Sequence, residues 1–276
     1  MLLGGCASAP PASLPPASAI PVRFLLSFDD GPSAALEGNP TRSILDDLAR
    51  NPIQPGIKAL FFVQTRAARA GASSVGQSLM RREQREGHLL GFHTATASHS
   101  NHRFLSPQAL DDSLQGGVAD LGAVLGEPPR LVRPPFWSYD RHTFEAYRRH
   151  GLSVLLTDLS ANDGKIWGFN GSPRRRSNLR AQLLQVRERI LAGELPVVAG
   201  EIPLVATFHD LNSYTARHLQ EYLQILLEEA HQAGLTTAAI PFYDNRVALQ
   251  RAALARTLRD PSQPSELPGL WNWLWR

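Results

Sequence analysis

Residues 22–32 read VRFLLSFDDGP, and this stretch decides how the rest of the chain is interpreted. Its first part, Val22–Phe28, is a short, mainly apolar run of the kind that forms a strand buried on both faces of a parallel sheet. Two adjacent carboxylates, Asp29 and Asp30, follow the run directly. Since parallel barrels carry their active sites at the carboxyl ends of their strands, the stretch predicts an α/β fold with a polar site there.

Six further runs of this kind follow, in alternation with helical patterns. The seven expected strands are Val22–Phe28, Lys58–Val63, His88–Phe92, Arg130–Arg133, Leu152–Thr157, Pro203–Phe208 and Leu235–Ile240. Alternation over seven rounds predicts a seven-stranded parallel (β/α) barrel with its active site at the C-terminal rim of the strands. An open doubly wound sheet is the alternative. No Gly-rich phosphate loop follows the first strand, which argues against the nucleotide-binding form of that alternative.

Helix starts are marked by two cap-and-proline pairs. Asn39-Pro40 and Ser106-Pro107 each place a capping residue before a proline at the first helical position. Gly126 is expected to end the second of these helices. Leucine-rich stripes at helical spacing predict three more helices, over approximately 179–191, 219–230 and 247–258.

Composition limits the kinds of partner. The net charge of +3 is too small to indicate nucleic acid as a partner. No stretch is long and apolar enough to span a bilayer. A chain of 276 residues can form one large barrel domain. We therefore expect a catalytic domain over residues 22–258, preceded by a tether over residues 1–21 and followed by a tail over residues 259–276.

Cys6 is the single cysteine, so no internal disulfide is expected. The sequence Leu3-Gly4-Gly5-Cys6 resembles the end of a bacterial lipoprotein signal, in which the cysteine is lipidated after cleavage. The charged and apolar regions that should precede it are missing, so we expect that the chain starts inside its signal peptide, and an accidental match is the alternative. The following Ala/Pro/Ser-rich run is typical of a disordered tether. We expect a cell-envelope protein, periplasmic or on the outer surface, attached to a membrane through lipidated Cys6.

Polar residues gather just after the expected strands. They are Asp29, Asp30, His93, His99, His102, Arg133, Asp158, Asp163, His209 and Asp210. Two histidines and one carboxylate suit a divalent metal such as zinc and leave positions open for water and substrate. A second carboxylate can take a proton from the water, an arginine can hold that carboxylate, and another histidine can protonate a leaving amine. This set of residues predicts metal-assisted hydrolysis of an amide or an ester.

The sequence SFDDGP at residues 27–32 resembles the first motif of the polysaccharide deacetylases, carbohydrate esterase family 4 with the NodB-type homology domain. The resemblance extends over approximately residues 22–240. It implies a distorted (β/α) barrel, and a hydrolase that releases acetate from an N-acetylated polysaccharide of the N-acetylglucosamine type. It also implies that Asp29 is the catalytic base and that Asp30 binds the metal.

His93-Thr94 and Ser98-His99 are similar to the two halves of the second motif of the family. The similarity implies that His93 and His99 are metal ligands. Two extra residues separate these histidines, and His102 is therefore kept as the alternative ligand. The implied cofactor is one divalent metal ion. Zinc is the expected metal, with cobalt and nickel as alternatives.

The run from Arg133 to Phe136 resembles the third motif. It implies that Arg133 orients the catalytic aspartate and that the backbone N–H of Phe136 stabilises the oxyanion. Trp137 stands where the family usually has glycine. This side chain is expected to shape the substrate groove or to stack on a sugar ring, and simple packing is the alternative.

Thr207-Phe208-His209 resembles the fifth motif, in which a leucine lines the acetyl pocket and the histidine is the general acid. The similarity implies that His209 is the acid and that Thr207 takes the substrate-facing position of the leucine. The fourth motif supplies an aspartate that tunes the acid. We expect Asp158, which directly ends its strand, and keep Asp163 as the alternative. Trp167 is a candidate for the aromatic lining that accompanies this motif.

Two rival functions follow from the same residues. The altered second, fourth and fifth motifs are compatible with a non-catalytic glycan-binding protein, and the same chemistry would also hydrolyse an O-acetyl ester. Binding alone would not require both Asp29 and His209, and their presence favours an enzyme. The sequence does not distinguish among peptidoglycan, chitin-like polymers and exopolysaccharides, and it does not indicate an oligomeric state.

Overall fold

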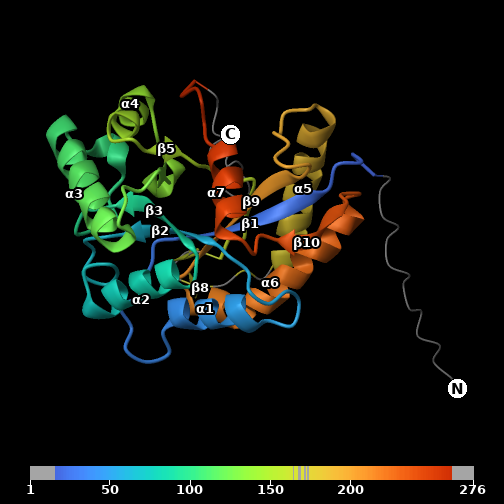
Figure 1. The fold of residues 1–276 in the computed structure, drawn as a ribbon, viewed down its shortest axis with the longest axis horizontal. Coiled ribbons are helices and arrows are strands. Elements are labelled where there is room, and N and C mark those ends of the chain that lie inside the picture. Colours follow the sequence, from blue (N-terminus) through green and yellow to red (C-terminus); the bar gives the residue numbers. More distant parts are fainter. Residues whose placement is uncertain (1–15, 164, 167–168, 171, 173, 263–276) are drawn as a thin grey trace, which may run out of the picture.

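The computed structural model describes residues 16–163, 165–166, 169–170, 172 and 174–262 (Figure 1). Cys6 and Trp167 lie outside the described residues, as does most of the expected tail. Within the described part of the chain, none of the helices combines the length and the apolar character needed to cross a membrane.

One parallel sheet forms the centre of the protein. Its strands are β1 (Val22–Asp29), β2 (Leu60–Gln64), β3 (Leu89–Thr94), β4 (Leu131–Val132), β5 (Ser153–Val154), β6 (Leu159–Ser160), β9 (Ile202–His209) and β10 (Thr237–Phe242). The order is β5-β4-β3-β2-β1-β9-β6, and β10 pairs with β1. Every pairing in this sheet is parallel. The expected parallel α/β barrel is confirmed. A separate antiparallel pair consists of β7 (Lys165–Ile166) and β8 (Phe169–Asn170).

The fifth expected strand, Leu152–Thr157, contains only the short β5, and β6 begins beyond it at Leu159. Its beginning pairs with β4, and the chain then crosses to β9, where Leu159 is opposite Ala206. Between the two strands, the Leu155 N–H donates to the carbonyl of Val132 in β4. Because one continuous segment contacts both ends of the curled sheet, it closes the barrel with a distortion at the point of crossing.

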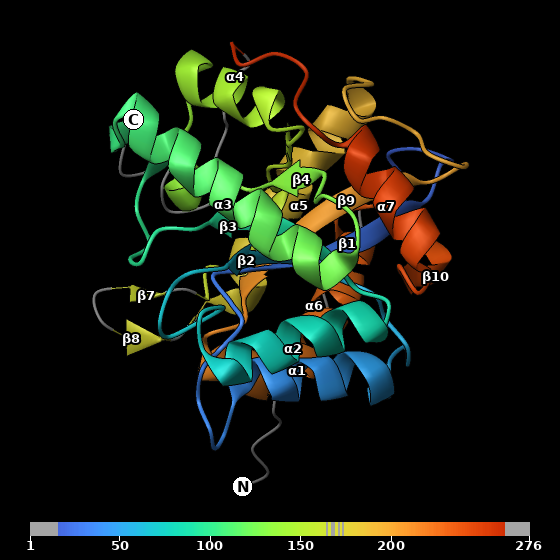
Figure 2. The same cartoon turned by 60° about the vertical axis from the view of Figure 1, so that its left-hand side comes forward.

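Helices surround the sheet (Figures 1 and 2). They are α1 (Pro40–Arg50), α2 (Ser74–Arg85), α3 (Pro107–Leu125), α4 (Arg141–Arg149), α5 (Arg175–Leu191), α6 (Ser213–Gln232) and α7 (Arg246–Ala255), with 3₁₀ turns at His102–Phe104 and Pro135–Trp137. Of these helices, α7 packs on the face of the sheet opposite to the others. The Asn39 and Ser106 side chains cap α1 and α3, and Gly126 ends α3 in the left-handed conformation, as expected. Figure 2 shows α1 and α2 side by side below the sheet.

The two faces of β1 have different surroundings. Phe28 stacks on Phe61 and Phe208 at centroid distances of 5.1 and 5.5 Å, within the core between the sheet and its outer helices. Leu25 belongs to a second apolar cluster that includes residues of α7. Since side chains alternate along a strand, Asp29 lies on the same face as Leu25. This face carries Leu25 in the middle of β1 and becomes polar at Ser27 and Asp29, where the strand ends.

Candidate active site

The expected polar residues converge at the carboxyl ends of the strands. Asp29 ends β1 and lies opposite His209, which ends β9. His93 lies near the end of β3, and Arg133 directly follows β4. Parallel strands bring their carboxyl ends to one edge, so residues more than a hundred positions apart in the sequence become neighbours.

The backbone conformation and close packing of the turn after β1 limit which residues can occupy it. Asp30 adopts a φ of +76°, a left-handed conformation that aspartate tolerates better than most residues. At Gly31, a Cβ atom would overlap the carboxylate of Asp210. Asp210 is itself buried and accepts a hydrogen bond from Thr41 Oγ1 at 2.8 Å. The Asp-Asp-Gly sequence therefore packs directly onto the carboxyl end of β9.

Three potential metal ligands lie together at this edge: Asp30, His93 and His99. His93 Nε2 is 3.1 Å and His99 Nε2 is 3.4 Å from Asp30 Oδ1. The two imidazole nitrogens are 3.0 Å apart. Tetrahedral ligands with metal bonds of about 2.1 Å lie roughly 3.4 Å from one another, so these three atoms have the spacing of a zinc-type site. A set of three protein ligands also leaves a position open for water.

The protonation of these groups suits a cation. His93 Nδ1 lies 2.8 Å from the carbonyl oxygen of Arg133, which is an acceptor only. The proton is therefore on Nδ1, and the lone pair of Nε2 faces the cluster. Burial and the neighbouring His93 lower the pKa of His99 to about 4, so its imidazole is neutral. Burial disfavours the charge of Asp30, but the contact with His93 and the positive charge of His209 outweigh it and lower the pKa.

His102 lies outside the cluster. Its ring is buried, with Nδ1 2.9 Å from Tyr147 Oη and Nε2 3.2 Å from Thr94 Oγ1. His99 instead stacks on the ring of Phe136, at a centroid distance of 4.5 Å. The two extra residues are accommodated in the loop before His99, and the structure brings His99 to the other two ligands.

Arg133 contacts the expected base. Its Nη1 lies 3.2 and 3.3 Å from the two carboxylate oxygens of Asp29, and both side chains are buried. The guanidinium lies between two rings, 4.4 Å from the centroid of Phe62 and 4.7 Å from that of Trp137. Trp137 therefore packs against Arg133, and because its side chain is partly exposed, a place in the substrate groove stays a prediction. Phe136 and Trp137 are consecutive residues with φ values of +59° and +58°, a strained backbone of the kind found at functional sites.

Asp163, and not Asp158, pairs with His209. Asp163 Oδ1 lies 2.8 Å from His209 Nδ1, and Asp163 Oδ2 accepts the His209 backbone N–H at 2.9 Å. Thr215 Oγ1 and Asn212 Nδ2 donate to the carboxylate and the backbone carbonyl of Asp163, respectively. The acid histidine is thus held by a carboxylate that has its own supporting hydrogen bonds.

The expectation for Asp158 is wrong because the chain does not stop there but continues into β6. Asp158 Oδ2 accepts from the Val205 backbone N–H, and Oδ1 accepts from Arg189 of α5 and from Arg256 at the end of α7. This carboxylate joins β9 to two helices and has no contact with His209.

The Asp163 carboxylate changes the protonation of His209. Burial disfavours the imidazolium, but the charge and hydrogen bond of Asp163, with smaller contributions from Asp30 and Asp29, raise the pKa of His209 to about 10. His209 is therefore protonated at neutral pH and can donate a proton from Nε2. Its side chain is one-quarter exposed, which leaves it accessible to a substrate.

Thr207 does not have the substrate-facing position expected for it. Its exposure is 0%, and its hydroxyl bonds to Ser27, Arg133 and Thr157 inside the barrel. Sequence reasoning missed this group of hydroxyls. Ser27 and Thr207 each precede an active-site residue by two positions, so alternation along the strands was the signal that could have found them.

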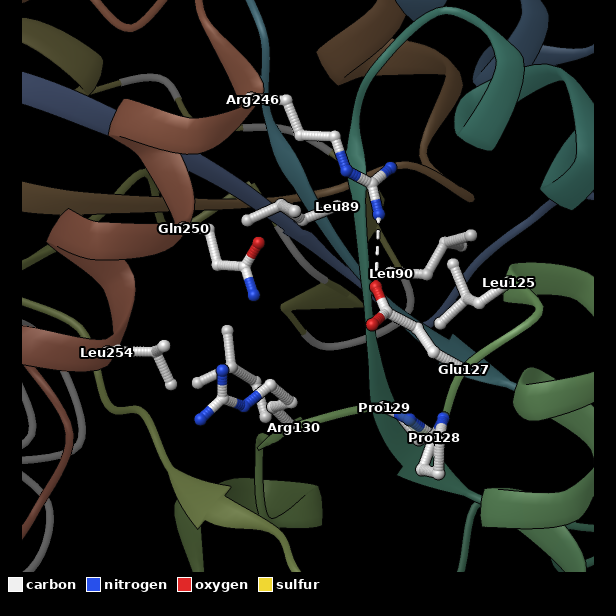
Figure 3. A pocket seen from close by; sticks show the side chains of 11 residues that line it. Leu89, Leu90, Leu125, Glu127, Pro128, Pro129, Arg130, Arg246, Gln250 and Leu254 are labelled. Atoms are coloured by element: carbon white, nitrogen blue, oxygen red, sulfur yellow. Dashed lines mark ion pairs between the residues drawn. The ribbon is translucent and has the colours of Figure 1, made fainter.

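A small cavity lies at the opposite end of the barrel, away from these residues (Figure 3). Its lining includes Leu89 and Leu131 at the starts of β3 and β4, and Arg246 and Glu127 form an ion pair across it at 4.0 Å. Its lining shares no residue with the candidate site, and the cavity belongs to the contact between α7 and the sheet.

Comparison with known proteins adds a family to this geometry. Residues 21–155 match the family model described as polysaccharide deacetylase. The matched segment contains Asp29, Asp30, His93, His99 and Arg133, and it ends before Asp163 and His209 join the site.

Individual proteins resemble larger parts of the chain. A chitin deacetylase of Pestalotiopsis sp is 33% identical over 172 residues, which are 59% of this chain and 53% of that protein. The peptidoglycan-N-acetylglucosamine deacetylase PgdA of Listeria monocytogenes is 30% identical over 148 residues, 52% of this chain and 27% of that protein. The chain thus spans about half, or less, of the length of the curated relatives it matches.

The chitin deacetylase from the fungal pathogen Colletotrichum lindemuthianum has a similar solved structure. The TM-score is 0.58 at 21% identity, over 83% of this chain and 96% of that chain. This likeness supports the distorted barrel as the fold.

Proposed function

We propose that this chain, which belongs to the polysaccharide deacetylase family, hydrolyses acetamide groups of an N-acetylated polysaccharide with the help of a divalent cation. The observation that carries the proposal is that three kinds of chemical group lie together at one edge of the barrel. A ligand set lies beside a carboxylate held by Arg133 and a histidine held by Asp163. Acetate and a free amino sugar would be the products.

Asp30, His93 and His99 would hold the cation, because their ligand atoms face one another at suitable distances. When bound, such a cation supplies a Lewis acid that polarises the acetyl carbonyl and acidifies a water molecule. Imidazole and carboxylate ligands favour zinc, and cobalt and nickel accept the same ligands.

The protein groups would divide the proton transfers between them. Asp29 would take a proton from the attacking water, and Arg133 would keep its carboxylate in a fixed direction. His209, protonated because of Asp163, would donate a proton to the departing amine. The backbone N–H of Phe136 would donate to the oxyanion that develops on the acetyl oxygen.

An N-acetylglucosamine polymer is the proposed substrate class. The two curated relatives are named for deacetylation of chitin and of peptidoglycan N-acetylglucosamine. Phe136 is 53% exposed beside His99 and offers a flat apolar face against which a sugar ring can pack. Attachment to the cell envelope through Cys6 is part of the same proposal and depends on the Leu3–Cys6 sequence alone.

The proposal can be tested by measuring acetate release from chitin oligosaccharides, from peptidoglycan and from an O-acetylated xylan. Protein stripped with chelator is compared with protein to which zinc, cobalt or nickel has been returned. We expect metal-dependent acetate release from an N-acetylated polymer. Release from the xylan alone would identify an O-acetyl esterase. Glycan binding without acetate release under any metal would identify a non-catalytic protein.

A further inference from the structure

We infer that Thr207 is a positioning residue, which holds the Arg133 guanidinium against the catalytic base through a buried chain of hydroxyl groups. The inference rests on the proposed function, in which Asp29 is the base and Arg133 directs it. The side chains of Thr207 and Ser27 are 0% exposed, so neither can touch a substrate.

Thr207 makes the shortest contact of the Arg133 terminal nitrogen. Nη1 lies 2.7 Å from Thr207 Oγ1, compared with 3.2 and 3.3 Å from the two oxygens of Asp29. Ser27 Oγ lies 3.2 Å from the same nitrogen. Ser27 and Thr207 are also directly opposite each other in the pairing of β1 with β9, with their oxygens 2.8 Å apart. The guanidinium is therefore seated on two neighbouring strands.

The direction of each hydrogen bond follows from the groups at the outer end of this series of hydroxyls. Thr157 Oγ1 donates to the carbonyls of Leu159 and Val205, which are acceptors only, and accepts from Thr207. The single proton of Thr207 is thus used, and both of its lone pairs remain for Ser27 and Arg133. The hydroxyl chain presents an acceptor to the guanidinium and cannot rotate to present a donor without breaking the bond to Thr157.

Thr207 adds the shortest of several restraints on the Arg133 guanidinium. The guanidinium also donates to Ser27 Oγ at 3.2 Å and to the Leu156 carbonyl at 3.4 Å. Leu155 O accepts from Nε at 2.8 Å and fixes the base of the guanidinium. The rings of Phe62 and Trp137 pack against it, with centroids 4.4 and 4.7 Å from its central carbon. Movement of the guanidinium toward or away from Asp29 is opposed on the inner side by the hydroxyl of Thr207. In a buried site, a nitrogen that lost this acceptor would shift toward another one.

The test compares Thr207→Val, which keeps the shape and removes the hydroxyl, with Thr207→Ser, which keeps the hydroxyl. Thr143→Val is the matched control, because Thr143 is equally buried but belongs to the cap of α4. We expect Thr207→Val to lower kcat by about ten- to a hundred-fold, as small misplacements of catalytic groups do. KM and metal affinity should stay near wild type, Thr207→Ser should recover most of kcat, and Thr143→Val should leave kcat unchanged.

A second readout is independent of activity. In wild-type protein labelled with ¹⁵N-arginine, the guanidinium protons of Arg133 should exchange slowly with water, and they are assigned by their absence in Arg133→Lys. Thr207→Val should accelerate this exchange, and Thr207→Ser should not. If Thr207→Val does not fold, Thr157→Val tests the same chain one hydrogen bond further out and should show the same changes in kcat and exchange.

The outcomes separate this inference from the proposed function. An unchanged kcat together with unchanged guanidinium exchange in Thr207→Val would overturn the positioning role. Equal loss of kcat in Thr207→Val and Thr207→Ser would also overturn it, because the hydroxyl would then be irrelevant. A wild-type protein that releases no acetate would reject the proposed function, while the exchange measurement would still show whether Thr207 holds Arg133.

Discussion

His209 is bound at two points by Asp163: its ring Nδ1 lies 2.8 Å from one carboxylate oxygen, and its backbone N–H lies 2.9 Å from the other. Ring and main chain are therefore fixed by the same group. The carboxylate also sets the protonation of the ring, since it contributes most to raising the pKa of His209 to about 10. Loss of this one charge should change the pH range of the reaction.

We predict that Asp163→Asn moves the alkaline limb of the kcat/KM profile to lower pH by roughly one to three units. The active form of His209 is protonated, so activity falls as pH rises through its pKa, and a lower pKa brings that fall to lower pH. Rate profiles between pH 5 and pH 11 provide the measurement. Asp158→Asn, which removes a carboxylate without contact to His209, should leave the limb in place. An identical limb in wild type and Asp163→Asn would refute the assignment.

Removal of His99 and removal of His102 should have different effects on metal binding. We expect His99→Ala to weaken zinc affinity by more than about a hundred-fold. Loss of a residue that only supports a ligand weakens affinity by up to about a hundred-fold, and loss of the ligand itself should have a larger effect. His102→Ala should keep the metal and lower the free energy of unfolding by about 1–3 kcal/mol, because Tyr147 and Thr94 lose a buried partner. Chelator competition and urea unfolding measure the two effects. The reverse pattern of metal loss would show that His102 is the ligand.

Asp29→Asn should separate turnover from metal binding. The amide keeps the shape of the carboxylate but cannot accept the proton, so we expect kcat to fall by about a hundred- to ten-thousand-fold. The metal content should be unchanged, because Asp30 is the carboxylate in the ligand cluster. Elemental analysis and acetate release are measured on the same preparation. Acetate release near the wild-type rate would exclude Asp29 as the base.

Gly31→Ala should disturb the turn that carries both aspartates. Its Cβ would overlap the Asp210 carboxylate, and we expect a loss of about 1–3 kcal/mol in the free energy of unfolding. Gly122→Ala in α3 is the control, since its Cβ would meet nothing closer than 3.9 Å and alanine favours a helix. The double variant Gly31→Ala/Asp210→Ala should recover part of the loss. No recovery would mean that the overlap with Asp210 is not the cause.

Glu83 is a buried acid whose carboxylate oxygens have no hydrogen-bond partner among the described residues. Burial, assisted by the charge of Asp210, raises the pKa of Glu83 well above its usual value. Its contribution to stability is thus present below the pKa of the unfolded chain and is lost as pH rises through the higher folded value. We expect Glu83→Gln to raise the free energy of unfolding at pH 8 by about 1–3 kcal/mol and to change it little at pH 4.

Urea unfolding at both pH values checks this prediction. Glu86→Gln is the contrasting variant, because the nearby His88 ring and the Arg82 ion pair lower the pKa of Glu86 to about 2. The contribution of the Glu86 carboxylate to the free energy of unfolding therefore has the opposite pH dependence, and it is lost on acidification. A Glu83→Gln protein that is destabilised at pH 8 would show that the carboxylate is stabilised in the fold.

The barrel and the ligand cluster were predictable because their signals are local. Apolar runs, the caps before Pro40 and Pro107, and polar residues just after strands all act within a few positions of the chain. Convergence of Asp30, His93 and His99 then follows from parallel strands alone, since their carboxyl ends share one edge.

The partner of His209 was not predictable from local pattern. Asp158 ends an apolar run, but the run belongs to a segment that leaves β4 and pairs with β9, and the site lies beyond β6. Only the sheet order shows that Asp163 reaches the ring. Thr207 was misread for the same reason, because its partners Ser27 and Thr157 come from neighbouring segments that are distant in sequence.

Arg133 touches the base with its side chain and the ligand His93 with its main-chain carbonyl. The side chain and the main chain at this position can therefore be changed separately, with different effects on the site. Replacing the side chain alters the base and leaves the carbonyl to orient His93. Changing the length of the segment that follows β4 moves the carbonyl and alters both. Libraries intended to change metal preference should keep the main chain around Arg133 intact, whereas libraries intended to alter the base can vary its side chain and the residues that contact it.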